Sequence, residues 1–280
     1  MKKVKLLPFI TIILLFISGC GESIYDGAAD KSTSAAVTDQ LDFDLIKGNC
    51  QSVINHYDNQ VSSNIILNDD DLYKYVSALL SCSGFNIVNG IDSILIDGGS
   101  DIYKTAGALM GITVIDMNKS ASLQSSYDKA IKVCFDRRTE LEKNNLKLTE
   151  TNTTLCGLAG MMGSIVNVTA MMLNTSGGGA NTLELSQTGF ENFAQNEMDG
   201  TLAAQGLASY LKEKNDFIMY LDNGLILGED GAAAVGTLMG QNDFSSVLKD
   251  LSTKLRDSSG AITETSLLEY LKTSLGLQIP

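Results

Sequence analysis

The chain has 280 residues and a formal net charge of −13, with 33 acidic and only 20 basic residues. Its Lys and Arg residues form no cluster that would serve as a phosphate-binding stripe, so the composition argues against a nucleic-acid partner. An acidic body is also repelled by anionic lipid, which argues against electrostatic attachment of the folded domain to a membrane surface.

The first twenty residues have the layout of an export signal. Lys2, Lys3 and Lys5 form a basic head, Leu6 to Ile17 form an apolar run, and small residues follow. The apolar run is too short for a stable transmembrane helix, and a cleavage site comes directly after it. We therefore expect residues 1–19 to be a signal peptide.

The end of this segment, Ile17-Ser18-Gly19-Cys20, resembles the lipobox of bacterial lipoproteins, whose cysteine is lipidated and becomes the mature N-terminus. The resemblance implies an acyl anchor on Cys20 and a membrane partner reached through it. Residues 20–38, small and polar after the cysteine, are then a flexible tether. Gly21, which is not an aspartate, implies the periplasmic face of the outer membrane in a two-membrane cell. A signal peptide with a coincidental cysteine is the alternative.

The mature chain shows helical patterns and no sustained alternation of apolar and polar residues. Its first apolar stripe runs from Leu41 to Tyr57. A second helix begins after the N-cap sequence Asn68-Asp69-Asp70-Asp71 and ends at Gly84. Further helices are expected over 86–96, from Asp101, and over 123–141, 155–173, 217–227, 232–239 and 244–255, with Thr263 capping the last one. We expect an all-α fold, a helical bundle or short helix-hairpin stack of about ten helices.

Part of this region resembles a tetratricopeptide array. The matching segments are Lys47-Gly48-Asn49-Cys50 through Tyr57 and then Leu72 to Phe85. Gly48 and Ala78 take the small-residue places of the repeat, whereas Cys50 stands where an aromatic residue is usual and the repeat's proline is absent. The resemblance implies a helix-hairpin stack used for protein contacts, as in exported lipoproteins of helical-repeat type.

Four cysteines follow Cys20 in the chain, namely Cys50, Cys82, Cys134 and Cys156. An even number in an exported protein predicts two disulfides with three possible connectivities, and four buried thiols are the alternative. If consecutive helices pack antiparallel, Cys50 and Cys82 lie at comparable distances from the loop between them. The same holds for Cys134 and Cys156 across the polar loop 144–152. We therefore predict the pairs 50–82 and 134–156.

The stretch from Leu155 to Leu173 is long and apolar enough for a transmembrane helix. Gly157, Gly160 and Gly163 give it a small-residue face of the kind that allows helices to approach closely, in membranes or in protein cores. Asn167 and the absence of flanking basic residues favour the central helix of a soluble bundle. A pore or membrane-inserted protein built around this stretch is the alternative.

Residues 175–186 contain the sequence TSGGGANT and form the clearest break in the mature chain. Because no GK[ST] follows the glycines, they do not form a phosphate-binding loop. The break predicts an N-terminal helical domain over 39–174 and a C-terminal helical portion over 187–280, packed on the first.

No catalytic constellation stands out. His56 is the only histidine and lies beside an apolar stripe, and no GxSxG motif is present. The paired methionines Met161-Met162 and Met171-Met172 favour core packing over a copper(I) site. Residues 255–266 lack acids at both anchoring positions of a calcium loop and predict a turn. We therefore predict no catalytic residue, no metal and no cofactor.

These observations favour a non-enzymatic binding or scaffolding lipoprotein of the cell envelope with a protein partner. The first alternative is an accessory or ligand-binding component of an envelope transport system, which would need a concave pocket with a few convergent polar groups. The second is an envelope enzyme in which acids converge on His56.

Overall fold

The computed structural model describes residues 34–86, 101–176, 181–239 and 244–278. The predicted signal peptide, the lipobox with Cys20, the tether up to residue 33 and nearly all of the helix expected over 86–96 lie outside the described residues. The chain divides into two compact units, residues 1–43 and 44–280. Residues 34–43 belong to the first unit, and all other described residues belong to the second.

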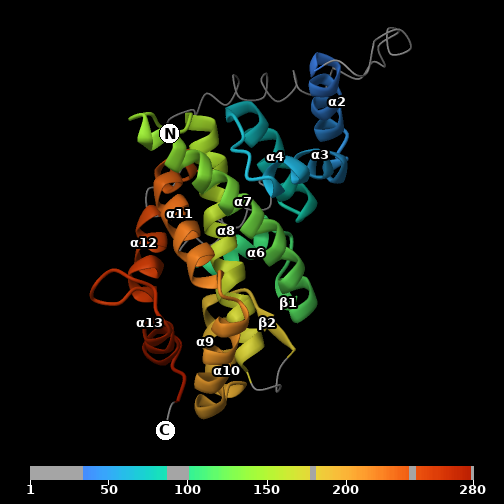
Figure 1. The fold of residues 1–280 in the computed structure, drawn as a ribbon. Helices are drawn as coiled ribbons and strands as arrows, with labels where there is room; N and C mark the ends of the chain where they lie inside the picture. The colour runs from blue at the N-terminus through green and yellow to red at the C-terminus, as the bar shows by residue number, and fades with distance from the viewer. Residues whose placement is uncertain (1–33, 87–100, 177–180, 240–243, 279–280) are drawn as a thin grey trace, which may run out of the picture. The chain divides into compact units, whose positions relative to one another are not determined.

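The all-α prediction is confirmed: the described residues form eleven α-helices, one π-helix and a single small sheet (Figure 1). The elements are α2 (Ser34–Ile46), α3 (Cys50–Ser62), α4 (Asp69–Cys82), α6 (Ile102–Leu109), β1 (Val114–Asp116), α7 (Met117–Lys143), α8 (Glu150–Thr175), β2 (Thr182–Glu184), α9 (Gln187–Asn196), α10 (Gly200–Glu213), α11 (Phe217–Met239), α12 (Phe244–Leu255), α13 (Glu264–Glu269) and the π-helix η1 (Tyr270–Ser274).

Helix α8 forms the centre of the second unit. Helices α7 and α11 pack along it, and α4 and α10 contact it as well (Figure 1). Every residue from Cys156 to Leu173 is buried. Among the described helices, α8 alone is long and apolar enough to cross a membrane, and 94% of its apolar window is buried inside the protein. This burial favours the core-helix interpretation of the stretch from Leu155 to Leu173.

Glycines bring α8 and α11 into backbone contact. A Cβ atom added at Gly157 would lie 2.5 Å from Gly231 Cα, and one added at Gly160 would lie 2.5 Å from the Gly224 carbonyl oxygen. As residue numbers increase along α8, the residue numbers of the contacts on α11 decrease, so the two helices are antiparallel. α11 runs unbroken through Gly228 and Gly231, where the sequence predicted two separate helices, because these glycines lie against α8.

Local start and stop signals were predicted correctly. The Asn68 side chain accepts hydrogen bonds from the backbone N–H groups of Asp70 and Asp71 at the start of α4. Gly84 follows the end of α4 with a φ of 90°, a left-handed conformation that favours glycine. Thr263 caps α13 in a reciprocal capping box with Ser266.

Three expectations about local structure are corrected. The stripe from Leu41 to Tyr57 is divided between α2 and α3, because Gly48 has a φ of 75° and turns the chain. The end of the predicted tether, Ser34 to Thr38, is helical. The segment 175–186, expected only as a break between helices, contains β2, which pairs antiparallel with β1 through Ile115 and Leu183. Each strand has three residues, too few for alternation to be recognised.

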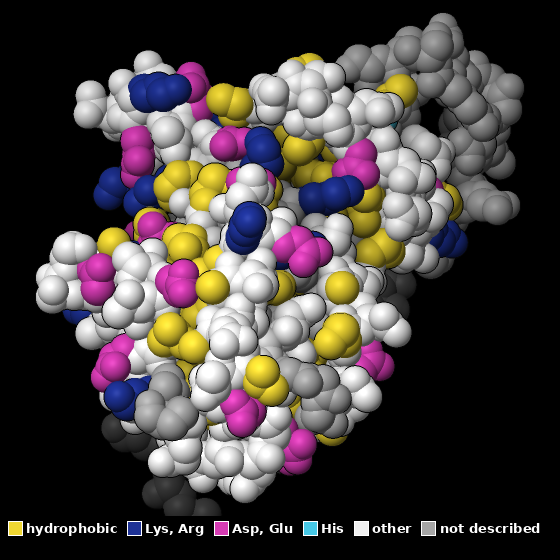
Figure 2. All heavy atoms as spheres, turned by 60° about the horizontal axis from the view of Figure 1, so that its bottom comes forward, with side chains coloured by type: hydrophobic (Ala, Val, Ile, Leu, Met, Phe, Trp, Pro, Cys, Tyr) yellow, Lys and Arg dark blue, Asp and Glu magenta, His cyan; other side chains and the backbone are white. Residues whose placement is uncertain are grey.

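The surface carries charges of both signs. On the face shown in Figure 2, acidic and basic side chains lie beside one another, and hydrophobic side chains reach the surface in small groups. Ile65 and Ile66 in the turn between α3 and α4, and Tyr73 in α4, are each more than 40% exposed. Single exposed apolar residues are ordinary, but neighbouring ones are of functional interest.

Candidate functional site

The structure forms both disulfides in the predicted pairing. Cys50 of α3 is joined to Cys82 of α4, with their Cα atoms 5.6 Å apart. Cys134 of α7 is joined to Cys156 of α8, with their Cα atoms 5.7 Å apart. Cys134 and Cys156 are buried, whereas Cys50 is partly exposed and Cys82 is exposed. The second disulfide therefore lies in the core and the first lies at the surface.

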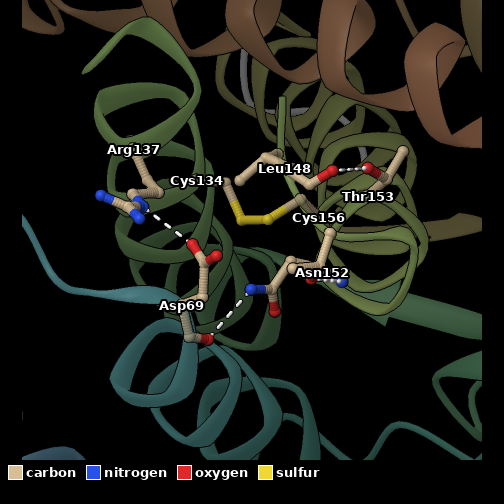
Figure 3. The surroundings of a disulfide bond; sticks show 8 residues. Asp69, Cys134, Arg137, Leu148, Asn152, Thr153 and Cys156 are labelled. Carbon is tan, nitrogen blue, oxygen red and sulfur yellow. Dashed lines mark hydrogen bonds and ion pairs between the residues drawn. A yellow bond between two sulfur atoms is a disulfide. The ribbon is translucent and has the colours of Figure 1, made fainter. Parts of the chain in front are cut away.

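Three helices meet at the Cys134–Cys156 disulfide (Figure 3). Arg137 of α7 donates from Nε to Asp69 Oδ1 over 2.8 Å, and Asn152 of α8 donates from Nδ2 to the Asp69 carbonyl oxygen over 2.9 Å. Asp69, the first residue of α4, is thus tied to both helices that the disulfide joins. These contacts fix the relative positions of α4, the end of α7 and the start of α8.

A partly open pocket of about 390 Å³ lies beside this disulfide. It is lined by residues from α7, the α7–α8 loop, α8 and α11: Arg138, Glu142, Lys147, Leu148, Thr153, Cys156, Leu227 and Asp230. Cys156 and Leu227 are each only 1% exposed and give the pocket an apolar floor. The four charged residues are more exposed and surround that floor.

Arg138 makes ion pairs with both acidic residues of the pocket. Its Nε lies 2.8 Å from Asp230 Oδ2 and its Nη2 lies 3.3 Å from Glu142 Oε1. Its guanidinium carbon lies 5.8 Å from the centroid of the Phe135 ring. Partly exposed ion pairs of this kind add little stability, so their main effect is to position the guanidinium.

The short α7–α8 loop places the remaining rim residues. Asn145 adopts a left-handed conformation with a φ of 56°, which asparagine tolerates, and turns the chain back after α7. Thr149 then caps α8 by accepting a hydrogen bond from the Asn152 backbone N–H. The Thr153 hydroxyl donates to the Leu148 carbonyl oxygen over 3.5 Å. The loop is thereby held against α8, with Lys147 exposed at the rim.

The other residues singled out from the sequence lie outside this pocket. His56 is exposed on α3, and its ring packs edge-on against Tyr57 at 4.8 Å between centroids. The paired methionines of α8 are buried in the core. Searching the described part of the chain finds no group of three or more His, Cys, Asp or Glu residues arranged to hold a metal ion.

Residues 255–266 form the turn that the sequence predicted. Asp257 Oδ1 accepts hydrogen bonds from the Ser259 hydroxyl and from the backbone N–H groups of Ser259 and Ala261. These bonds, led by the one from the Ser259 hydroxyl, hold the pKa of the Asp257 carboxyl below its usual range. The carboxylate therefore serves as the anchor of the turn between α12 and α13.

A second polar cluster lies inside the bundle, between α7, α8 and α10. Gln124 donates from Nε2 to Asn167 Oδ1 over 2.7 Å and to the Tyr210 hydroxyl over 3.2 Å. Asn167 in turn donates from Nδ2 to Asp128 Oδ1 over 3.0 Å. Burial raises the pKa of Asp128 to about 6, although the Asn167 hydrogen bond and nearby Lys214 oppose the shift.

This raised pKa predicts a pH-dependent stability. The folded carboxyl binds a proton more readily than the unfolded one, whose pKa is 3.8, so folding is penalised increasingly as the pH rises from about 4 to about 6. Asp128→Asn keeps an acceptor oxygen for Asn167 and removes the charge. We expect it to raise the free energy of unfolding at pH 7 by about 2 kcal/mol and to leave it nearly unchanged at pH 4.

Urea unfolding of both proteins at these two pH values measures the effect. Asp136→Asn is the matched control, because Asp136 lies on the same helix in a partly exposed pair with Lys132. It should change the stability by less than about 1 kcal/mol at either pH. An equal gain at both pH values for Asp128→Asn would show that the buried charge is not the cause.

The fold and the pocket together define the chain as an all-α bundle, built around a buried glycine-rich helix and held by two disulfides. Comparison with protein-family models, with curated proteins and with solved structures finds no match to this chain.

Proposed function

We propose that this protein is an exported, lipid-anchored binding protein of the bacterial cell envelope, without enzymatic activity. The observation that carries the binding role is the pocket beside Cys134–Cys156, where four charged side chains surround an apolar floor. Pockets with an apolar lining and a few convergent polar groups are typical of small-molecule sites. The exposed position of His56, outside the pocket, supports a binding role over catalysis.

Two features support the location. Disulfides form and persist in oxidising compartments, and this chain has two of them. The sequence from Lys2 to Cys20 resembles a lipoprotein signal, and Gly21 favours the periplasmic face of the outer membrane. The acyl group on Cys20 would then attach the protein to the membrane, since α8, the one described helix apolar enough to cross it, is packed inside the bundle.

Replacing Cys20 by serine tests this location. Two proteins are expressed. The first keeps its own lipoprotein signal and Cys20, and the second carries Cys20→Ser behind a cleavable secretory signal. We expect the first protein to incorporate labelled fatty acid and fractionate with the outer membrane, and the second to fractionate entirely with soluble periplasmic proteins. Retention of the Cys20→Ser protein in the membrane through a carbonate wash would contradict the proposal and favour insertion through α8.

A scaffolding role is the second candidate, and the α3–α4 hairpin favours it. Ile65 is 53% exposed, and Ile66 and Tyr73 lie close to it in the chain with 43% and 44% exposure. The same hairpin carries the segments that resemble a tetratricopeptide repeat, and the Cys50–Cys82 disulfide makes it rigid. A protein partner would bind this hairpin, away from the residues that line the pocket.

A further inference from the structure

We propose that the pocket between α7, α8 and α11 binds a small zwitterion that carries an apolar group, of the class of hydrophobic amino acids and short peptides with free termini. This inference rests on the proposed binding function and specifies its ligand class. It follows from the size of the pocket, its floor and the arrangement of its four charges.

The size and the floor suit one small apolar group. The volume of about 390 Å³ falls in the lower part of the range of roughly 300–1,000 Å³ found for ligand pockets. The floor consists of Leu227 and Cys156, and half-buried Leu148 also lines the pocket. An aliphatic side chain placed there would leave water for an apolar surface that the protein has already formed.

The basic groups of the pocket can hold a carboxylate. Arg138 uses Nε and Nη2 for Asp230 and Glu142, so its Nη1 remains without a partner among the described residues. Lys147 is exposed on the rim and makes no ion pair with any described residue. A carboxylate between these two cations would receive charge-assisted hydrogen bonds, which are among the stronger ones in proteins.

The acidic groups can hold an ammonium group at the same time. Arg138 contacts Asp230 through Oδ2 and Glu142 through Oε1, which leaves Asp230 Oδ1 and Glu142 Oε2 unpaired within the described part of the chain. Both side chains are about half exposed, so a ligand can reach them. An ammonium group there would pair with carboxylates that Arg138 already orients.

The balance of charge selects a zwitterion over other ligands. Two positive and two negative side chains line the pocket, and a pure cation or a pure anion would add a partner only for those of opposite sign. An uncharged apolar ligand would remove water from these charged groups without offering them a new partner, which is costly. The net charge of −13 also repels free anions from the whole chain.

Calorimetric titration of the Cys20→Ser chain with the dipeptide Leu-Leu tests the inference. The same dipeptide with an acetylated N-terminus and an amidated C-terminus is the control ligand, since it has the same apolar groups and neither charge. We expect Leu-Leu to bind and the blocked dipeptide to bind at least about tenfold more weakly, as the loss of charged hydrogen bonds predicts.

Two pairs of variants locate the site. Lys147→Ala and Glu142→Gln remove groups that line the pocket and should each weaken Leu-Leu binding about tenfold. Lys143→Ala and Glu140→Gln remove the same charges from neighbouring positions that do not line it, and should leave binding unchanged. Thermal melting of each variant checks that it is folded.

The outcomes separate this inference from the proposed function. No binding of Leu-Leu at millimolar concentration, equal binding of the blocked dipeptide, or equal effects of the Lys147 and Lys143 variants would each overturn the ligand class. Fractionation of the Cys20→Ser protein with the membrane would instead overturn the anchoring role, and it would leave the titration result unaffected.

Discussion

Replacing Gly157 by alanine is expected to lower the free energy of unfolding by about 3 kcal/mol, the upper part of the range for overpacked cores. The added Cβ would lie 2.5 Å from Gly231 Cα and 3.2 Å from the Gly231 carbonyl carbon. Both atoms belong to the backbone of α11, so no side-chain rotation relieves the clash. The two helices would have to move apart, and α8 packs on several other helices as well.

Gly163→Ala on the same helix is the matched control. Its added Cβ would also approach an atom to 2.5 Å, but that atom is Cδ1 at the end of the Ile131 side chain. A flexible side chain can move, and alanine gains up to about 1 kcal/mol in helix propensity over glycine. We therefore expect a loss of less than about 1 kcal/mol.

The midpoint of urea unfolding, with its slope unchanged, measures both effects. Gly231→Ala should match Gly157→Ala, because its Cβ would meet Gly157 Cα at 2.5 Å. Equal losses at Gly157 and Gly163 would show that backbone contact between α8 and α11 does not set the stability of the bundle.

The contact between the glycines of α8 and α11 was only half predictable from the sequence. Helical spacing and capping residues such as Asn68 and Thr263 are local signals, and they predicted most of the helices and the starts of α4 and α13. The glycines of α8 were recognised as a face for close approach. Their partners at Gly224, Gly228 and Gly231 were not, since a contact between distant segments leaves no local pattern. The matching glycine spacing in the second segment was the signal that could have identified it.

The candidate site was also predictable only where it depends on residues close in the sequence. The two disulfides were predictable because each joins consecutive helical segments across one intervening stretch of chain. The pocket was not predictable, because it depends on Asp230 of α11 meeting Arg138 of α7. In the sequence, the charges of α7 look like those of any solvated helix face, so nothing singles out Arg138. The signal present was that Arg138 and Glu142 follow Cys134 at helical spacing, on the part of α7 fixed by the disulfide.

Removing both disulfides is expected to lower the free energy of unfolding by about 7 kcal/mol, because each closes a loop worth roughly 3–4 kcal/mol in the chain-entropy model. The loops span 32 and 22 residues in sequence separation. A loss of this size approaches the whole stability of a typical domain. The variant with alanine at all four cysteines should therefore be unfolded, or nearly so, at 37 °C.

The two disulfides should also differ in how they respond to a reductant. Cys82 is exposed, so dithiothreitol should reduce Cys50–Cys82 in the folded protein, with a loss of about 3–4 kcal/mol and little change in Leu-Leu binding. Cys134–Cys156 is buried, with Cys156 lining the pocket, and should resist reduction until the protein unfolds. Cys134→Ala with Cys156→Ala should therefore weaken binding as well as stability.

Denaturant unfolding of the oxidised protein, of the two paired variants and of the fourfold variant separates these contributions. If the stability needed for folding comes from the disulfides, the chain folds only where cysteines are oxidised, and its fold and its export depend on each other. A fully reduced protein as stable as the oxidised one would show that folding does not require oxidised cysteines. The disulfides would then give no physical support to an envelope location, and the case for export would rest on the sequence from Lys2 to Cys20 alone.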